Sequence, residues 1–190
     1  PRRRRVLQMV ETKKAPNQIV RLALVLFLVS AIVSGVLGFV NMLTKDRIAE
    51  LEAQARAEAY NAVLPWDGEY VNVEYDKEAF ETVDAIAQAG DEGWVVELTF
   101  SGAQSSISAA FGVSPDYTIT GASVISHAET SGLGAKIVEE DFLASFVGQT
   151  EGMAVTKDGG TVDSITAATI SARAMANAAN TAIAVVKSLG

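Results

Sequence analysis

The most prominent feature of the hydrophobic pattern is an uninterrupted apolar run near the beginning of the chain. Residues 22–44 contain no charged side chain over 23 positions. A helix of that length is about 34 Å long, which exceeds the ~30 Å hydrocarbon core of a bilayer. We therefore predict one transmembrane helix over residues 18–44, with Arg21 at its edge, where a long basic side chain reaches the lipid headgroups. A cleaved signal peptide is the alternative, but residues 41–45 offer no small-residue cleavage site.

The segment 45–68 predicts a helix that continues out of the membrane and ends in a turn. Residues 45–64 are rich in Ala, Glu and Arg, which favour a helix, and Pro65 ends it. Pro, Asp and Gly within residues 65–68 are typical of a turn. The remaining residues, 69–190, are predicted to form a separate domain.

Strand patterns dominate the first half of this domain. Every second residue between 94 and 100 is large and apolar, as expected for a strand, and residues 105–113 and 119–125 are also β-like. We predict a small antiparallel sheet over residues 93–126. The preceding segment 69–92 contains a short β-like stretch and then an acidic part with little periodicity, which we interpret as surface.

Helical patterns follow the predicted sheet. Residues 139–147 predict a short helix, and the Ala-rich residues 167–188 predict a long helix at the end of the chain. Between them lie a Gly-Gly turn at 159–160 and a short β-like stretch at 162–165. Strands grouped together with helices at the ends indicate an α+β domain behind a single-span anchor.

Charge is distributed unevenly along the chain, whose net charge is −8. Residues 1–17 carry six basic side chains and one acidic side chain, whereas the chain from Thr44 onward carries eight basic and 22 acidic side chains. Because basic flanks remain on the cytoplasmic side, we predict a cytoplasmic tail over residues 1–17. The domain then lies across the cytoplasmic membrane, in the periplasm or at the cell surface. Its acidic character argues against a nucleic-acid partner.

The amino-acid composition restricts the possible chemistry. The chain has no Cys, and His127 is its single His. The absence of Cys excludes disulfides, thiolate zinc sites, iron–sulfur clusters and thiol nucleophiles. One imidazole does not make a multi-histidine metal site, so we predict no metal centre. Any Ser-His-Asp triad has to use His127.

Residues 126–137 concentrate polar groups directly after a predicted strand. His127, Glu129 and Thr130 precede a Gly-Leu-Gly turn at 132–134. A turn with two glycines lets backbone N–H groups approach a phosphate or a planar ring. The alternative interpretation is a solvated loop with a buried His127 that donates to a carbonyl group.

A second polar cluster, residues 163–171, lies where the last helix is predicted to begin. In the simplest interpretation Asp163, Thr166 or Thr169 is the N-cap of that helix. The same position also suits an anion, because unpaired N–H groups and the helix dipole attract phosphate there. Three candidate oxygen-bearing side chains at one helix start exceed what a cap requires.

Together the two clusters resemble the FMN-binding domain of the G subunit of Rnf-type ion-translocating electron-transport complexes. The C subunit of the sodium-pumping NADH:quinone reductase is similar. In that family a His-x-Glu-Thr-Pro-Gly-Leu-Gly loop is followed by Asp-x-x-Ser/Thr-Gly-Ala-Thr-x-Ser/Thr. The matching residues here are His127, Glu129, Thr130, Gly132, Leu133 and Gly134, then Asp163, Thr166, Ala168, Thr169 and Ser171. Ser131 replaces the Pro of the first motif, and Ala167 replaces the Gly of the second.

The resemblance implies that Thr169 carries FMN through a phosphoester bond, installed from FAD by a dedicated flavin transferase. It also implies that the matching residues of both motifs bind the cofactor, with loop 127–134 beside the flavin and Glu129 or Thr130 hydrogen-bonded to it. Ala167 is the departure with the larger expected effect, because a methyl group removes the backbone freedom of glycine.

The resemblance further implies a one-flavin relay in a membrane complex that moves electrons between ferredoxin and NAD and drives Na⁺ or H⁺ transport. This chain has no dinucleotide-binding fingerprint and no cluster ligands, so we expect other membrane subunits to supply them and to complete the reaction. The C-type subunit is the related alternative; we expect insertions in it, so a length of 190 residues favours the Rnf type. A membrane-anchored sensor or adaptor that binds a ligand without redox chemistry is the alternative of another class.

Overall fold

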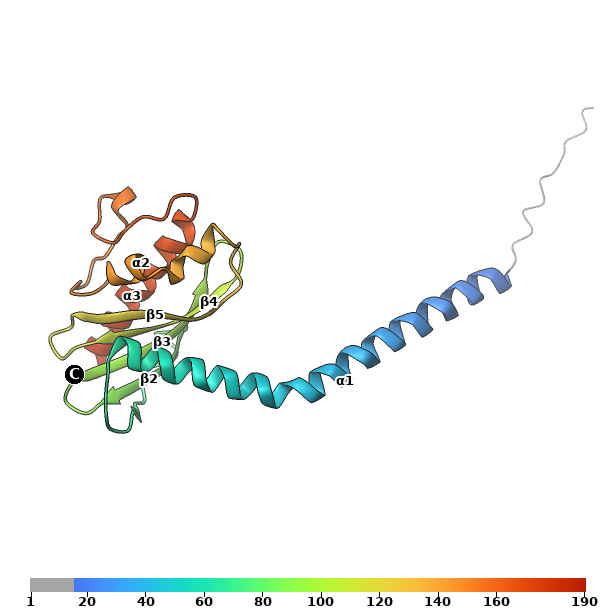
Figure 1. The fold of residues 1–190 in the computed structure, drawn as a ribbon, viewed down its shortest axis with the longest axis horizontal. Coiled ribbons are helices and arrows are strands. Elements are labelled where there is room, and N and C mark those ends of the chain that lie inside the picture. Colours follow the sequence, from blue (N-terminus) through green and yellow to red (C-terminus); the bar gives the residue numbers. More distant parts are fainter. Residues whose placement is uncertain (1–15) are drawn as a thin grey trace, which may run out of the picture. The chain divides into compact units, whose positions relative to one another are not determined.

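The computed structural model describes residues 16–190, with side chains from residue 18 onward. The chain divides into two compact units, one that ends at Ala49 and one that comprises Glu50–Gly190. One helix, α1 (Pro16–Val63), contributes to both units (Figure 1). Most of the predicted cytoplasmic tail, residues 1–15, lies outside the described residues.

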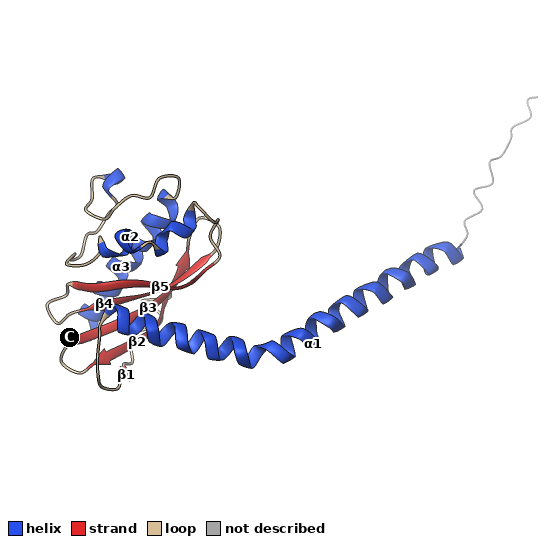
Figure 2. Ribbon diagram, in the orientation of Figure 1, coloured by secondary structure: helices blue, strands red, loops and turns tan. Residues whose placement is uncertain are grey.

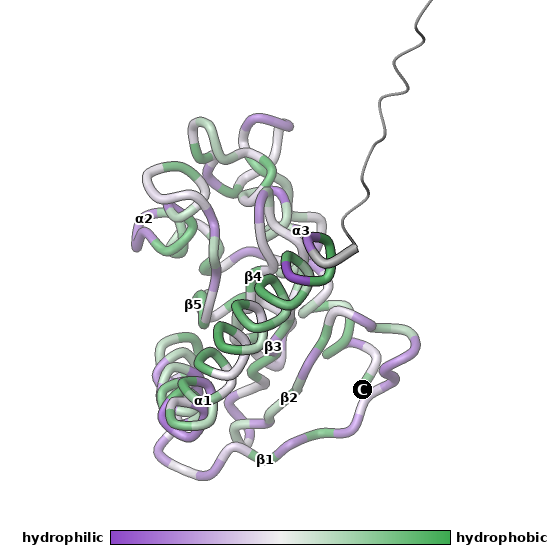
Figure 3. The backbone as a smooth tube through the Cα atoms, turned by 90° about the vertical axis from the view of Figure 1, so that its right-hand side faces the viewer, coloured by the Kyte–Doolittle hydropathy of each residue, from purple (hydrophilic) through white to green (hydrophobic). Residues whose placement is uncertain are grey.

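In the first unit, α1 exposes apolar side chains on every side. Leu24 and Phe27, for example, are 57% and 69% exposed, and the part of the helix that follows the grey residues is mostly green in Figure 3. Within the described residues this is the one helix long and apolar enough to cross a membrane. It agrees with the predicted anchor, and the helix continues as predicted until Val63, two residues before Pro65.

The second unit is an antiparallel sheet of five strands in chain order, with helices around it (Figure 2). The predicted α+β class is confirmed. The strands are β1 (Val71–Asn72), β2 (Val83–Ala89), β3 (Gly93–Ser101), β4 (Ser106–Val113) and β5 (Ile119–His127). The helices that follow are η1 (Gly134–Val138), α2 (Glu140–Ala144), η2 (Thr156–Asp158) and α3 (Thr169–Leu189). The predicted β-like stretch 162–165 forms no strand; a single parallel bridge joins Val162 to Val155.

Strand β2 was not predicted, because segment 69–92 was interpreted as surface. Its register against β3 shifts between Val83 and Ala85. Such a bulge inserts one residue and reverses the alternation of faces. Val83 and Ile86 are therefore both buried although they are three positions apart, and this spacing conceals the period of two. Acidic residues on both sides of the strand also give segment 69–92 the composition of a surface segment.

Both faces of the sheet are covered, and β3 shows how its residues divide between them. Val96 and Leu98 belong to the core cluster that contains Met175 of α3. Val95, which points to the opposite face, packs in a second cluster with Val63 at the end of α1. The period-two pattern predicted for β3 is thus confirmed, with an apolar layer on either side.

A notch of two glycines receives the end of α1. Gly112 of β4 and Gly121 of β5 lie directly opposite each other, and a Cβ atom on either would collide with the backbone of Val63. The hydroxyl of Thr120 donates a 2.6 Å hydrogen bond to the carbonyl of Val63. The helix end is therefore held by its backbone as well as by its side chains.

A buried carboxylate also ties α1 to the sheet. Glu97 of β3 is only 3% exposed. The guanidinium of Arg56 contacts both of its oxygens, at 2.8 and 2.9 Å, and the Tyr60 hydroxyl donates to it at 3.1 Å. A buried charge costs little only when it is paired and hydrogen-bonded, and these two partners satisfy that condition.

Candidate functional site

The two sequence motifs meet at one buried hydrogen bond. The hydroxyl of Ser171, in the first turn of α3, donates to Oε2 of Glu129 at 2.9 Å. Strand β5 ends at His127, so the loop that leaves it reaches the start of α3 within two residues. The structure therefore brings the two motifs together.

Glu129 acts as the centre of this junction. Its other oxygen, Oε1, accepts the backbone N–H groups of Gln104 and Ser105, each at 3.0 Å, and the carboxylate is 6% exposed. Burial raises the pKa of the Glu129 carboxyl, but the hydrogen bonds from Gln104, Ser105 and Ser171 outweigh it, so the pKa lies below its ordinary value. Both carboxylate oxygens are engaged by the protein. Glu129 therefore orients the loop and α3.

One glycine of the first motif makes room for this carboxylate. A Cβ atom at Gly134 would overlap Oε2 of Glu129, and one at Gly102, in the β3–β4 turn, would overlap Oε1. Gly134 is buried, whereas Gly132 is exposed and has a φ of 76°, in the left-handed region. The two glycines thus serve different purposes, close packing and a turn.

The rest of the first motif forms the rim of the site. His127 is half-buried, not buried as in the alternative interpretation, and its Nδ1 accepts the N–H of Glu129 at 3.2 Å. The carbonyl of Thr130 accepts the N–H groups of Leu133 and Ala135 at 3.1 and 3.2 Å. The side chains of Thr130 and Leu133 are exposed, Leu133 by 44%.

The second motif leads into α3 without capping it. Thr169 is the first residue of the helix; Ala168 is at the N-cap position, and no side chain caps the helix there. The interpretation of Asp163, Thr166 or Thr169 as an N-cap is therefore wrong. Asp163 and Thr166 are exposed, Ala168 is buried and Thr169 is half-buried. The uncapped start keeps the Thr169 hydroxyl available for another partner.

Ala167 has a φ of 66°, in the left-handed region that favours glycine. This is the position at which the family motif has Gly. A left-handed conformation costs a non-glycine residue about 1–2 kcal/mol, because its Cβ approaches the following carbonyl. The backbone nevertheless adopts the left-handed conformation at Ala167. Ala in place of Gly therefore makes this conformation less favourable in free energy but does not change the path of the backbone.

Sequence reasoning missed one residue of the site, Lys157. Its Nζ lies 3.5 Å from Oγ1 of Thr169. Both line a hollow, which also includes Thr156, Ser164, Ile165, Thr166 and Ala167. The only available signal was a lone cation before the Gly159-Gly160 turn, which does not reveal a contact 12 positions away.

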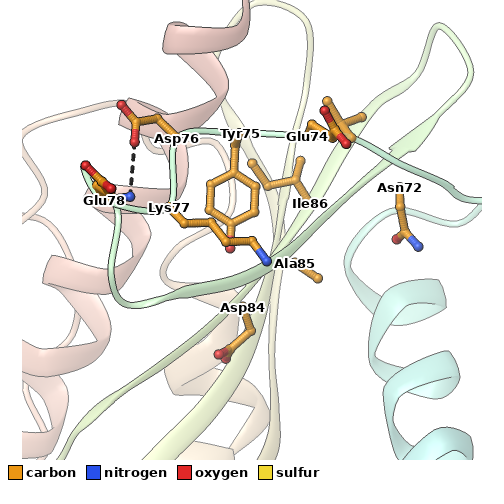
Figure 4. Close-up of a pocket in the computed structure, with 10 residues that line it drawn as sticks. Asn72, Glu74, Tyr75, Asp76, Lys77, Glu78, Asp84, Ala85 and Ile86 are labelled. Carbon is orange, nitrogen blue, oxygen red and sulfur yellow. Dashed lines mark hydrogen bonds between the residues drawn. The ribbon is translucent and has the colours of Figure 1, made fainter.

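A larger hollow lies elsewhere and contains no residue of either motif. It is formed by β1, β2 and the loop between them, and Glu74, Asp76, Lys77 and Asp84 are among its lining residues (Figure 4). Asp76 there accepts the N–H of Glu78 at 3.0 Å. Within the described residues no group of three or more His, Asp or Glu side chains is placed to hold a metal ion. The motifs and the Lys157 contact favour the Thr169 hollow as the site.

The chain is similar to known proteins over most of its length. Residues 102–184 match the FMN-binding domain family, and residues 9–63 match the RnfG N-terminal region. The chain is 32% identical over 176 residues to the G subunit of the ion-translocating oxidoreductase complex of Methanosarcina acetivorans, covering 88% of this chain and 94% of that one. The corresponding protein of Pseudomonas aeruginosa is 30% identical over 189 residues, covering 88% of each chain.

Among solved structures, the C subunit of the Na⁺-translocating NADH-quinone reductase of Parabacteroides distasonis is similar. Its TM-score is 0.47 at 25% identity, and the match covers 66% of this chain and 78% of that one.

Fold, motifs and matches define an FMN-binding domain joined to a long apolar helix. The chain belongs to the family of G subunits of ion-translocating oxidoreductase complexes, which are redox-driven translocases. The predicted family is thereby confirmed, and so is the preference for the G type over the C type.

Proposed function

We propose that this chain carries one FMN, esterified through its phosphate to Oγ1 of Thr169, and that it relays electrons through this flavin. The observation that supports the proposal best is the state of the Thr169 side chain. The hydroxyl does not cap its helix; it faces Lys157 in an open hollow. A phosphate bound there meets the positive end of the α3 dipole and a nearby ammonium group.

The residues around Thr169 fit a tethered flavin. FMN supplies reversible electron transfer when bound, and the protein supplies its position and its access. Thr169 holds the phosphate end. Leu133 and Ile170, which are 44% and 61% exposed, offer apolar surface on the first motif and beside Thr169. Glu129 and Ser171 hold the two motifs together through their own hydrogen bond, which does not involve the Thr169 hydroxyl.

The partners follow from the family and the composition. The chain works in a membrane complex that couples electron transfer between ferredoxin and NAD to Na⁺ or H⁺ transport. Other subunits of that complex hold the NAD site and the iron–sulfur clusters. A flavin transferase loads the chain from FAD. Covalent attachment prevents loss of the cofactor in a compartment that does not replace it.

The attachment is tested by co-expression with a flavin transferase, followed by intact-mass measurement and in-gel fluorescence after denaturation. We expect the wild-type chain to gain the mass of one FMN less water and to fluoresce. Thr169→Ala should abolish both signals, whereas the control variant Thr181→Ala, on the same helix but outside the hollow and both motifs, should keep them. A colourless wild-type chain, or fluorescence that survives in Thr169→Ala, contradicts the proposal.

The orientation is part of the same proposal, with residues 1–17 in the cytoplasm and the FMN-binding domain across the membrane. The chain has no Cys, so a single Asp91→Cys substitution in the exposed β2–β3 turn provides a specific label site. We expect a membrane-impermeant maleimide to label it on intact cells or spheroplasts. Labelling only after lysis would place the domain on the cytoplasmic side.

A further inference from the structure

Lys157 places a cation beside the proposed attachment atom. Its Nζ lies 3.5 Å from Oγ1 of Thr169, across the hollow that both residues line. An ammonium group has three donors, and one so close to the ester oxygen is adjacent to any phosphate bonded to that oxygen. On the basis of the proposed function, we propose that Lys157 binds the phosphate during and after its attachment to Thr169.

The backbone that carries Lys157 is held in place by a defined set of bonds. The N–H of Lys157 donates to Oγ of Ser164 at 2.8 Å, and the Thr156 hydroxyl donates to the same oxygen at 2.9 Å. The turn then closes at Gly159, whose φ of 83° lies in the left-handed region. Ser164 belongs to the segment that leads to Thr169, so the lysine and the threonine are positioned together.

The carboxylate of Asp158, the residue that follows Lys157 in the sequence, is paired with another cation. Both oxygens of Asp158 contact the guanidinium of Arg173 on α3, at 2.5 and 2.6 Å. The hydrogen bond from Arg173 lowers the pKa of the Asp158 carboxyl below its ordinary value. The Asp158–Arg173 pair thus fixes η2 against α3 and takes up the charge of the residue next to Lys157. The ammonium of Lys157 remains directed at the threonine.

The acidic character of the domain makes this cation important. From Thr44 onward the chain carries eight basic and 22 acidic side chains, which repel an incoming flavin phosphate. Arg173 is engaged by Asp158, and Lys187 is engaged by Glu151 at 2.5 Å. Lys157 is the basic residue that faces the Thr169 hydroxyl.

The covalent step itself conserves atoms and involves no oxidation. Oγ1 of Thr169 forms a bond to the phosphorus of the FMN half of FAD. The pyrophosphate bond of FAD breaks, AMP leaves, and the hydroxyl proton is released. Phosphate oxygens are negatively charged throughout, and a charge-assisted hydrogen bond from Lys157 stabilises them as the new bond forms.

The inference is tested by the initial rate of flavin attachment to the purified full-length chain, in detergent, with FAD and a flavin transferase. We expect Lys157→Gln to slow attachment about tenfold at low salt, the loss of one charge-assisted bond. Lys157→Glu should be slower still, and Lys157→Arg should remain within about twofold of wild type, because it keeps the charge. High salt should reduce the difference between wild type and Lys157→Gln, since it screens an exposed charge.

Lys187→Gln is the matched control, because it removes a basic residue of the domain away from the Thr169 hollow and should leave the rate unchanged. Urea unfolding of each variant excludes a loss of the fold as the cause of a slower rate. Equal rates in wild type, Lys157→Gln and Lys157→Glu overturn the inference alone. A wild-type chain that accepts no flavin overturns the proposed function and this inference with it.

Discussion

Ser171 donates a 2.9 Å hydrogen bond to the buried carboxylate of Glu129, and this contact joins residues 42 positions apart. It connects the loop after β5 to the first turn of α3. The start of α3, and with it Thr169, is therefore positioned by the first motif. The first motif thus has a structural role in positioning Thr169, which does not depend on a contact with the cofactor.

We expect Ser171→Ala to lower the free energy of unfolding by about 1–2 kcal/mol, because it removes a donor from a buried carboxylate. Ser188→Ala, at an exposed position of the same helix, is the control and should change it by less than about 0.5 kcal/mol. Urea unfolding measures both values. If the two variants are equally stable, the Ser171–Glu129 bond does not hold the motifs together.

Acid should weaken the same junction. The folded-state pKa of Glu129 lies below its ordinary value, so the carboxylate stabilises the fold above the unfolded-state pKa of about 4.3. This contribution is lost as the pH falls through the lower folded-state value. We expect Glu129→Gln to be less stable than wild type at pH 7 and to lose less stability on acidification. Unfolding measured from pH 7 to pH 3 tests this; parallel curves for the two proteins contradict it.

The left-handed backbone at Ala167 predicts a stabilising substitution. Ala167→Gly should raise the free energy of unfolding by about 1 kcal/mol, since glycine adopts this φ without the Cβ penalty. Ala168→Gly should lower it, because Ala168 is buried and has a φ of −131°. Thermal unfolding compares the two. A lower melting temperature for Ala167→Gly would show that Ala167 is not strained.

Tyr60 predicts a loss of stability in alkali. Burial and the neighbouring Glu97 raise the pKa of the Tyr60 phenol above its ordinary value of about 10. Its contribution is therefore fully present below that pH and decreases as the pH rises above it. Tyr60→Phe should cost about 1 kcal/mol at pH 7 and should show a flatter decline above pH 10. An unchanged alkaline decline in the variant would contradict this assignment.

The sequence predicted the elements whose patterns are local. The anchor, strands β3 to β5 and helix α3 are each indicated by a local pattern or composition (apolar, alternating, β-like or Ala-rich), and the structure contains all of them. Strand β2 was not predicted from the sequence, because its bulge between Val83 and Ala85 depends on pairing with β3. Register along a neighbouring strand is a tertiary property that no single segment records.

The site was predicted only as far as its motifs. The family resemblance implied a role for Thr169 and for the residues of both loops. It did not reveal that Glu129 turns inward to Ser171, because that depends on the space left by Gly102 and Gly134. Lys157 belongs to neither motif, and its approach to Thr169 follows from the η2 turn and the Asp158–Arg173 pair.

The glycine notch under Val63 determines where a soluble version of the domain has to begin. A fragment that starts after Pro65 lacks the last turns of α1, which cover Ala87, Val95 and Ala110. Such a fragment exposes Gly112 and Gly121 and the apolar face around them, and exposed apolar surfaces promote aggregation. A fragment that begins near Glu50 keeps the end of α1 that covers this face, together with the Arg56 and Tyr60 contacts to Glu97. For crystallisation, we therefore expect a fragment that begins near Glu50 to remain monodisperse and one that starts after Pro65 to aggregate.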